Sequence, residues 1–185
     1  MELNKYLFEK IYSAVGHSSF MDAVAIFFAE YFTYLLIAGV AFWILSRGGK
    51  KIIFSVFSFV FLSVLFSRGI ITEVIRYFYK SPRPFTALGF EPLIFDGNQS
   101  FPSGHTAFLF AFAFSIFLIN KKFGIWLAVA GLLVALARIY AGVHWPFDIL
   151  GGVVVALIGT FIAHFLLKKF TGSNPALKSN EVSGE

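Results

Sequence analysis

The chain has 185 residues, of which 58% are hydrophobic and 19% aromatic, and its mean hydropathy is +0.79. A soluble domain is usually about 45–50% apolar, so this composition excludes an ordinary small soluble protein and favours lipid as the solvent. The formal net charge is +5, but the basic residues lie mainly between apolar segments, which disfavours a nucleic-acid-binding protein. No cysteine is present, so disulfides and thiolate metal sites are excluded.

The N-terminal segment predicts an amphipathic helix. Residues 1–20 place apolar side chains on one stripe at roughly helical spacing. These side chains are Leu3, Tyr6, Leu7, Ile11 and Val15. The pattern fits a helix in the membrane interface or one packed on the end of a bundle. Because the segment lacks the basic start and cleavage site of a signal peptide, we expect it to be retained.

Five apolar segments follow, each expected to cross a bilayer, which takes about 20 residues. They cover residues 22–46, 52–79, 102–120, 123–140 and 147–167. We therefore expect an all-α, polytopic membrane helix bundle of about five spans, in one domain over residues 1–170. Residues 171–185 are polar and rich in Ser, Asn and Gly, which predicts a disordered tail.

Loop charge predicts the orientation. The basic turns at residues 47–51, 121–122 and 168–169 fall on one side of a five-span protein, and the positive-inside rule makes that side cytoplasmic. The tail would share that side. The polar clusters described next fall on the other side. We therefore expect a multi-pass protein of the inner (plasma) membrane, with its site facing the periplasm or the cell exterior.

Charged residues inside the spans should face protein or water rather than lipid. We expect Glu30 to pair with a basic residue of the second span, with a direct catalytic role as the alternative. Arg68 and Glu73 should join a salt-bridge ladder between helices. Arg76 and Lys80 are four residues apart and so would share a helix face. For Arg76 we favour a functional role, because of the residues that follow it.

Two segments after the second span present polar groups outside regular helix. The prolines of the Lys-Ser-Pro-Arg-Pro-Phe stretch should hold Arg83 on a stiff, extended segment. Residues 86–101 then form a long polar-aromatic loop, which fits either a functional lid or a linker.

The third span opens with Pro102, Ser103, Gly104 and His105. Proline suits the first turn of a helix, and glycine lets a ligand approach the backbone closely. The free N–H groups and the positive end of the helix dipole make this turn a candidate anion site.

The corner between the last two spans carries Arg138, His144 and Asp148. If Pro146 lies in the first helical turn, His144 and Asp148 lie one turn apart on the same face. The carboxylate would then hold the imidazole in one tautomer and stabilise its cation. Asp148 is the only carboxylate that we expect in the cluster.

Several cations, a helix N-terminus and two histidines predict an anion site that can transfer protons. One histidine would attack phosphorus while the other protonates the leaving oxygen. A zinc site built from His105, His144 and Asp148 is the alternative. We disfavour it because the surrounding arginines would repel a dication.

The order and spacing of these residues resemble the three-part signature of the type 2 phosphatidic acid phosphatase family, which in turn resembles acid phosphatases and vanadium haloperoxidases. That signature has Lys, six residues and Arg-Pro; then Pro-Ser-Gly-His; then Ser-Arg, five residues, His, three residues and Asp. The resemblance covers roughly residues 50–168. Arg76 stands at the lysine position, where nearby Lys80 is an alternative cation, and Ala137 replaces the serine.

The resemblance implies a metal-independent lipid phosphatase without a cofactor. His144, oriented by Asp148, would form a phosphohistidine, and His105 would protonate the leaving oxygen and later activate water. The phosphate would be held by Arg76 or Lys80, by Arg83, Arg138 and Ser103, and by the backbone N–H of Gly104.

The small size, the five spans and the Pro-Arg-Pro-Phe stretch look most like bacterial undecaprenyl-diphosphate phosphatases, which recycle the carrier lipid of cell-wall synthesis. Phosphatidylglycerophosphate, phosphatidate and lipid A phosphates are alternative substrates. A non-enzymatic lipid-binding or transport protein is the alternative of another class. The expected partners are the bilayer and a lipid phosphate but not nucleic acid, and the oligomeric state stays open.

Overall fold

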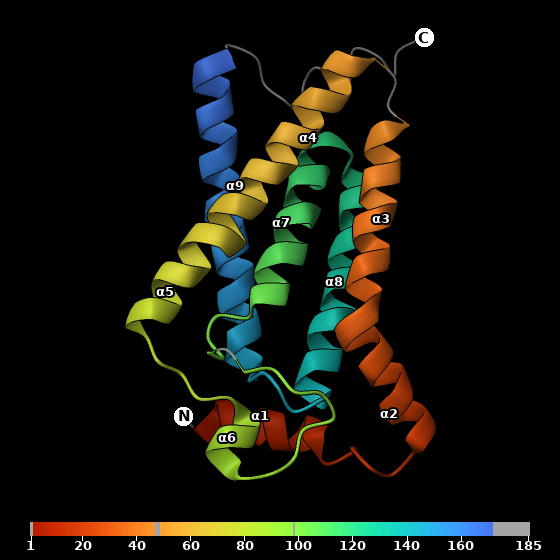
Figure 1. Cartoon of the computed structure of the whole chain (residues 1–185), viewed down its shortest axis with the longest axis vertical. Coiled ribbons are helices and arrows are strands. Elements are labelled where there is room, and N and C mark those ends of the chain that lie inside the picture. Colours follow the sequence, from red (N-terminus) through yellow and green to blue (C-terminus); the bar gives the residue numbers. More distant parts are fainter. Residues whose placement is uncertain (1, 47–48, 98, 172–185) are drawn as a thin grey trace.

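A computed structural model of the chain describes residues 2–46, 49–97 and 99–171. Within these ranges the protein is built from helices and has no strand (Figure 1). The longer elements are α1 (Glu2–Tyr12), α2 (Ser19–Ile26), α3 (Phe32–Leu45), α4 (Lys50–Val64), α5 (Thr72–Phe78), α7 (Gly104–Ile119), α8 (Lys121–Tyr140) and α9 (Pro146–Thr171). The short α6 (Pro84–Leu88) lies in the connection between α5 and α7.

Four of the five expected spans are long and apolar enough to cross a bilayer. They are Ser19–Leu45, Lys50–Phe78, Lys121–Tyr140 and Pro146–Lys169. The fifth, α7, is apolar but has only 16 residues. Large apolar side chains on the bundle exterior, such as Phe42, Phe54 and Phe161, are exposed as a lipid-facing surface requires. The predicted all-α membrane bundle is therefore confirmed, with one span shorter than expected.

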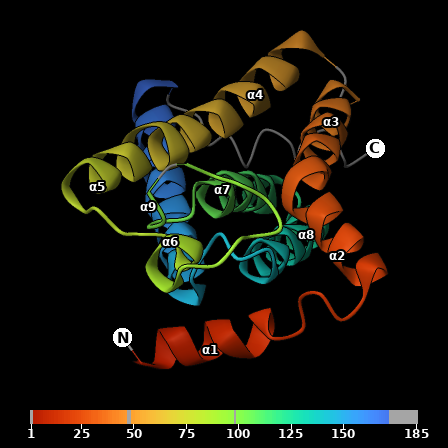
Figure 2. The same ribbon diagram turned by 60° about the horizontal axis from the view of Figure 1, so that its bottom comes forward.

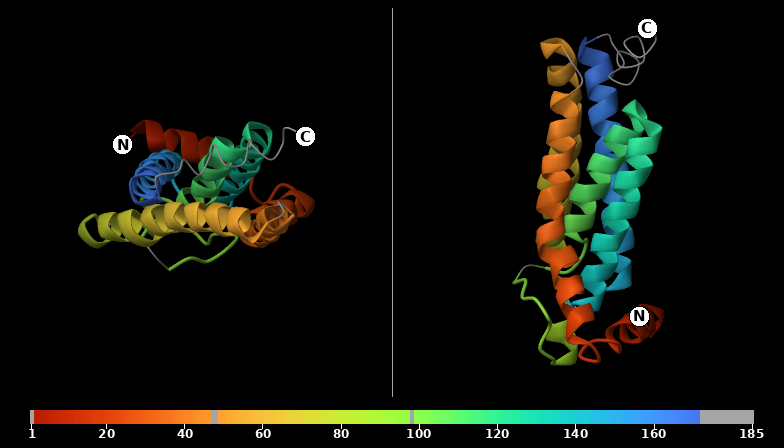
Figure 3. Two further views of the ribbon diagram at one scale, coloured as in Figure 1. Left: turned by 90° about the horizontal axis from the view of Figure 1, so that it is seen from above. Right: turned by 90° about the vertical axis from the view of Figure 1, so that its right-hand side faces the viewer.

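Helix α7 lies in the middle of the bundle, where it packs against α8, α9 and α4 (Figure 2). Small residues on α9 permit this close packing. A methyl group at Gly152 would lie 2.8 Å from the Ser103 carbonyl oxygen, and one at Gly159 would lie 2.2 Å from the Ser67 hydroxyl. Helices α4 and α5 form one long run along a side of the bundle (Figure 3).

Two of the long helices contain a π-helical segment. The segment Phe27–Tyr31 joins α2 to α3, and Leu65–Ile71 joins α4 to α5. Such widened turns are frequent at functional sites. Here the carbonyl of Ala29 in the first segment accepts a hydrogen bond from Nη1 of Arg138, at 3.1 Å. The hydropathy pattern gave no sign of either segment.

Helix α1 packs across one end of the bundle. Phe8 is fully buried and lies against the rings of Tyr12, Phe90 and Trp145. Of the two alternatives for this segment, the structure therefore favours a helix docked on the bundle end. Leu3 is on the expected apolar stripe but remains exposed.

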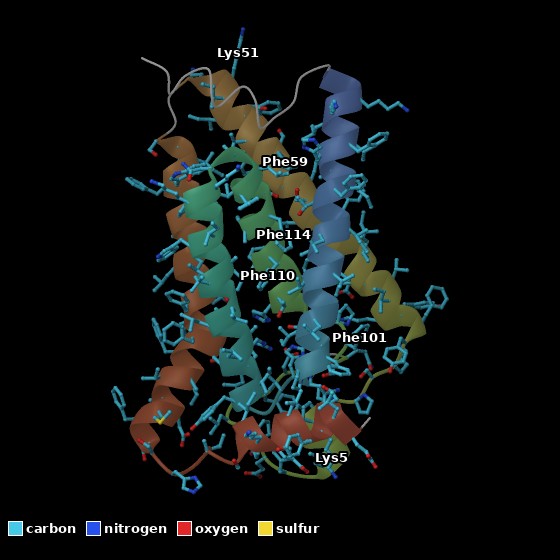
Figure 4. All side chains as sticks on the ribbon, turned by 180° about the vertical axis from the view of Figure 1, so that it is seen from behind. Lys5, Lys51, Phe59, Phe101, Phe110 and Phe114 are labelled. Atoms are coloured by element: carbon cyan, nitrogen blue, oxygen red, sulfur yellow. The ribbon has the colours of Figure 1, made fainter. Side chains whose placement is uncertain are left out.

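The basic turns lie at the other end of the molecule from α1. Figure 4 shows Lys51 at that end and Lys5 of α1 at the opposite one. Lys121 starts α8 and Lys168 lies in the last turn of α9, at the same end as Lys51. Arg47, which belongs to the first basic turn, lies outside the described residues, as does the expected tail beyond Thr171.

Candidate active site

Five elements bring the three polar clusters together at the α1 end of the bundle (Figure 1). The side chains are Arg76 of α5, Arg83 just before α6, Ser103 just before α7, Arg138 near the end of α8, His144 just before α9 and Asp148 in the first turn of α9. All six are buried, and the three arginines are only 3–7% exposed. A cavity of about 240 Å³ opens beside them, and its lining includes His105 and His144.

His144 and Asp148 make the contact that their spacing predicted. Helix α9 begins at Pro146, and Oδ2 of Asp148 lies 3.3 Å from Nδ1 of His144. The same oxygen accepts hydrogen bonds from the Ser100 hydroxyl at 2.5 Å and from the Trp145 N–H at 2.8 Å. An acceptor at Nδ1 places the imidazole proton there, which leaves the lone pair on Nε2.

The surroundings disfavour the protonated form of His144. Burial lowers the pKa of His144 well below its ordinary value, and the charges of Arg138 and Arg83 lower this pKa further. Nη1 of Arg83 lies 3.4 Å from Nε2 of His144. The unprotonated nitrogen therefore faces the cationic side of the cluster, where an anion would bind.

Asp96 of the long loop is a second carboxylate of the cluster and is partly buried. Its Oδ1 lies 2.8 Å from Nη2 of Arg83, and its Oδ2 lies 2.7 Å from Nη2 of Arg138. The expectation that Asp148 would be the only carboxylate here was therefore wrong. The sequence shows that Asp96 lies in a polar loop, but only the folded loop returns it to the arginines.

The start of α7 is organised around Ser103. Its hydroxyl accepts hydrogen bonds from the N–H and the hydroxyl of Thr106, and its own N–H donates to the Asp148 carbonyl at 2.9 Å. Ser103 is thus the N-cap of α7. The sequence predicted Pro102 in the first turn of this helix. In the structure Pro102 precedes the N-cap and so lies outside that turn. His105 lies in that turn and lines the cavity.

Arg76 and Lys80 do not share a face. Helix α5 ends at Phe78, and Tyr79 is extended, so the spacing of one helical turn does not apply to Lys80. The Lys80 ammonium is exposed and lies 5.8 Å from the centre of the Tyr77 ring. Arg76 is buried, donates to the Pro102 carbonyl at 3.0 Å and lines the cavity. Of the two candidate cations, this geometry favours Arg76.

This arrangement of arginines, serine cap and two histidines agrees with the comparison to known proteins. Residues 57–171 match the PAP2 superfamily. The chain belongs to the PAP2 superfamily.

Three similar proteins illustrate the relationship. The undecaprenyl-diphosphatase BcrC of Bacillus subtilis (strain 168) is 32% identical over 165 residues, which cover 86% of this chain and 82% of that protein. The bacitracin transport permease protein BcrC of Bacillus licheniformis is 34% identical over 171 residues, which cover 89% of this chain and 79% of that protein. The crystal structure of Aquifex aeolicus LpxE matches with a TM-score of 0.70 at 26% identity, covering 87% of this chain and 94% of that one.

The PAP2 cluster contains another cation, Arg68, for which the sequence predicted a structural role. Arg68 lines the cavity together with Arg76 and Gly104. It pairs with Glu73 of the same continuous helical run, and Arg76 lies 3.9 Å from the same Glu73 oxygen. The expectation of a ladder between helices was therefore wrong. Glu30 also lacks its expected partner, because it forms no ion pair with any residue whose position is described.

The PAP2 site offers oxygen and nitrogen ligands but is dominated by cations. In the part of the chain that the structure describes, no three His, Asp or Glu side chains come together in a way that suits a metal ion. His105 and His144 line the same cavity as Arg68 and Arg76. Positive charge of this density favours an anionic ligand.

Proposed function

We propose that this protein is a membrane-embedded phosphatase that hydrolyses undecaprenyl diphosphate to undecaprenyl phosphate through a phosphohistidine, without a metal. The observation that carries the proposal is the setting of His144. Its Nδ1 faces Asp148, and its neutral Nε2 faces buried arginines beside an open cavity.

The phosphate would bind to the three buried arginines and the first turn of α7. Arg76, Arg83 and Arg138 carry three positive charges, of which Asp96 offsets one. A buried excess of positive charge is stabilised by an anion, and guanidinium groups match phosphate oxygens in geometry. The helix start adds the backbone N–H of Gly104 and a favourable dipole.

In the first chemical step, Nε2 of His144 forms a bond to phosphorus and the bond to the leaving oxygen breaks. Asp148 stabilises the positive charge that develops on the ring. His105 lines the same cavity and donates a proton to the leaving oxygen. Fixed arginine charges stabilise the charge on the transferring phosphoryl group.

In the second step, water attacks phosphorus and the bond to His144 breaks, which releases inorganic phosphate. His105, now neutral, accepts the proton of that water. The protonation states of both histidines are then restored for the next substrate. No step needs an additional reactant.

The lipid substrate and the outward orientation belong to the same proposal. Two observations support a polyprenyl diphosphate: a relative is named undecaprenyl-diphosphatase, and the site lies at the end of an apolar bundle. The basic residues at the other end of the bundle support a site that faces the periplasm or the cell exterior. Phosphatidylglycerophosphate, phosphatidate and lipid A phosphates are the alternative substrates.

A transport or lipid-binding role is the second candidate, because one relative is named a bacitracin transport permease protein. Phosphate release by purified protein separates the two functions. The assay uses detergent solution with a chelator and tests undecaprenyl diphosphate beside the three alternative lipids. We expect release to fall at least about 1000-fold in His144→Ala and to persist in the control His17→Ala, whose side chain is exposed. No release by folded wild-type protein would overturn the phosphatase.

A further inference from the structure

We propose that Arg68 binds the phosphate that departs with the lipid and thereby makes the enzyme prefer diphosphates to phosphomonoesters. This inference rests on the proposed function, because it assigns the part of the substrate that Arg68 contacts. Three features of Arg68 support this role: its neighbours, its exposure and the cavity that it shares with His105.

Arg68 is packed against the first residue of α7. A methyl group at Gly104 would lie 2.7 Å from Nε of Arg68 and 3.2 Å from its Cζ. Glycine at this position therefore makes room for the guanidinium group beside the free N–H groups of the helix start. His105, the next residue of α7, lines the same cavity as Arg68.

Arg68 also differs from the other arginines in its exposure. Its side chain is 36% exposed, whereas that of Arg83 is 3% exposed. Glu73, its ion-pair partner, is 53% exposed. An exposed ion pair is held weakly in water, so a phosphate can compete with Glu73 for Arg68 at little cost. The buried arginines are fixed, while Arg68 stands at the accessible part of the cavity.

The reaction requires a cation at this place only for one class of substrate. When His144 attacks the terminal phosphorus of a lipid diphosphate, the bridging oxygen keeps the bonding electrons and departs as part of a lipid monophosphate. This lipid monophosphate remains negatively charged even after His105 has donated one proton to it. A lipid phosphomonoester instead releases an alcohol, which is neutral after the same proton transfer. Arg68 would therefore stabilise departure from a diphosphate alone.

The decisive measurement is the ratio of kcat/KM for a polyprenyl diphosphate to that for the monophosphate of the same chain length. We expect Arg68→Gln to lower this ratio roughly 10- to 100-fold, the worth of a hydrogen bond to a charged group. Arg68→Lys should restore part of it. The control Lys10→Gln removes an exposed cation at the same end of the molecule and should leave the ratio unchanged.

A purely structural role for Arg68 predicts a different pattern. If the ion pair with Glu73 only stabilises the helix, Arg68→Gln and Glu73→Gln should lower both rates equally and leave the ratio constant. If Arg68 binds the departing phosphate, Glu73→Gln should maintain or raise the ratio, because it releases a competitor. Equal losses on both substrates would overturn the inference and leave the phosphatase intact.

A binding measurement keeps the inference separate from turnover. With His144→Ala in the background, calorimetry compares inorganic pyrophosphate with inorganic phosphate. We expect Arg68→Gln to weaken pyrophosphate binding at least about tenfold more than phosphate binding. Equal weakening would overturn the role of Arg68 even if wild-type protein released phosphate. Absence of that release would overturn the proposed function, while this comparison would still decide what Arg68 binds.

Discussion

Asp96 holds Arg138 through a contact of 2.7 Å, although the two residues are 42 positions apart in the chain. The other carboxylate oxygen of Asp96 contacts Arg83. Both arginines are proposed phosphate ligands, so the loop supplies an internal anion where the substrate would place its own. The substrate phosphate must therefore displace this carboxylate or share the arginines with it.

The first prediction concerns this competition. Asp96→Asn keeps the shape of the side chain but removes one negative charge between two guanidinium groups. We expect inhibition by vanadate or inorganic phosphate to tighten about 3- to 10-fold, since a tenfold change corresponds to about 1.4 kcal/mol. Inhibition constants check this, with Glu9→Gln on the exposed face of α1 as control. Weaker inhibition would mean that Asp96 serves mainly to orient the arginines.

A second prediction follows from the three contacts to Oδ2 of Asp148. Asp148→Asn should lower kcat at least about 100-fold, because an amide cannot both accept these hydrogen bonds and stabilise the imidazolium. Ser100→Ala should lower kcat less, about 10-fold, because the Trp145 N–H still orients the carboxylate. Steady-state kinetics test which of the two variants loses more kcat, and circular dichroism spectra show that both are folded. A larger loss in Ser100→Ala would contradict it.

The pH dependence gives a third prediction. A protonated His144 cannot attack phosphorus, so kcat/KM falls as the pH drops through its pKa. Because burial lowers this pKa, the acid limb should lie below about pH 6.5, the ordinary histidine value. In Arg83→Gln, loss of a neighbouring positive charge should move the limb of the residual activity toward higher pH. An acid limb above the ordinary value in the wild type would show that another group controls the rate.

Helix packing provides a fourth prediction. Gly159→Ala would place a methyl group 2.2 Å from the Ser67 hydroxyl and 2.6 Å from its backbone nitrogen. We expect a loss of about 1–3 kcal/mol, as for other overpacked interiors, seen as a lower melting temperature in detergent. Gly39→Ala is the matched control, because a methyl group there meets nothing within 4 Å. Equal melting temperatures for the two variants would contradict the close contact.

The orientation is the fifth prediction, and the chain has no cysteine to complicate its test. Gly97→Cys lies in the exposed part of the loop beside Asp96, and Lys122→Cys lies at the opposite end of the bundle. In intact cells, an impermeant thiol reagent should label the first variant and leave the second unlabelled until the cells are opened. The reverse pattern would place the site in the cytoplasm.

The sequence predicted the helices better than the loops. Long apolar runs located the spans to within a few residues, because hydropathy depends on composition alone. The contact between His144 and Asp148 followed from helical spacing, since α9 starts where its proline suggested. The same helical spacing misplaced Lys80, because α5 ends at Phe78, before that residue. Asp96 and Arg68 could not be placed, since a loop path and a π-helical turn leave no periodic signal.

The shortness of α7 sets how far the site lies inside the bundle. From their shared turn at Asn120, α7 has 16 residues and α8 has 20. At 1.5 Å per residue they rise about 24 and 30 Å, so the turn that carries Ser103 and His105 stops about 6 Å short of the far end of α8. The proposed phosphate site at the start of α7 is thus recessed from that end of α8. A lipid headgroup therefore reaches the proposed site only by entering the bundle past the end of α8.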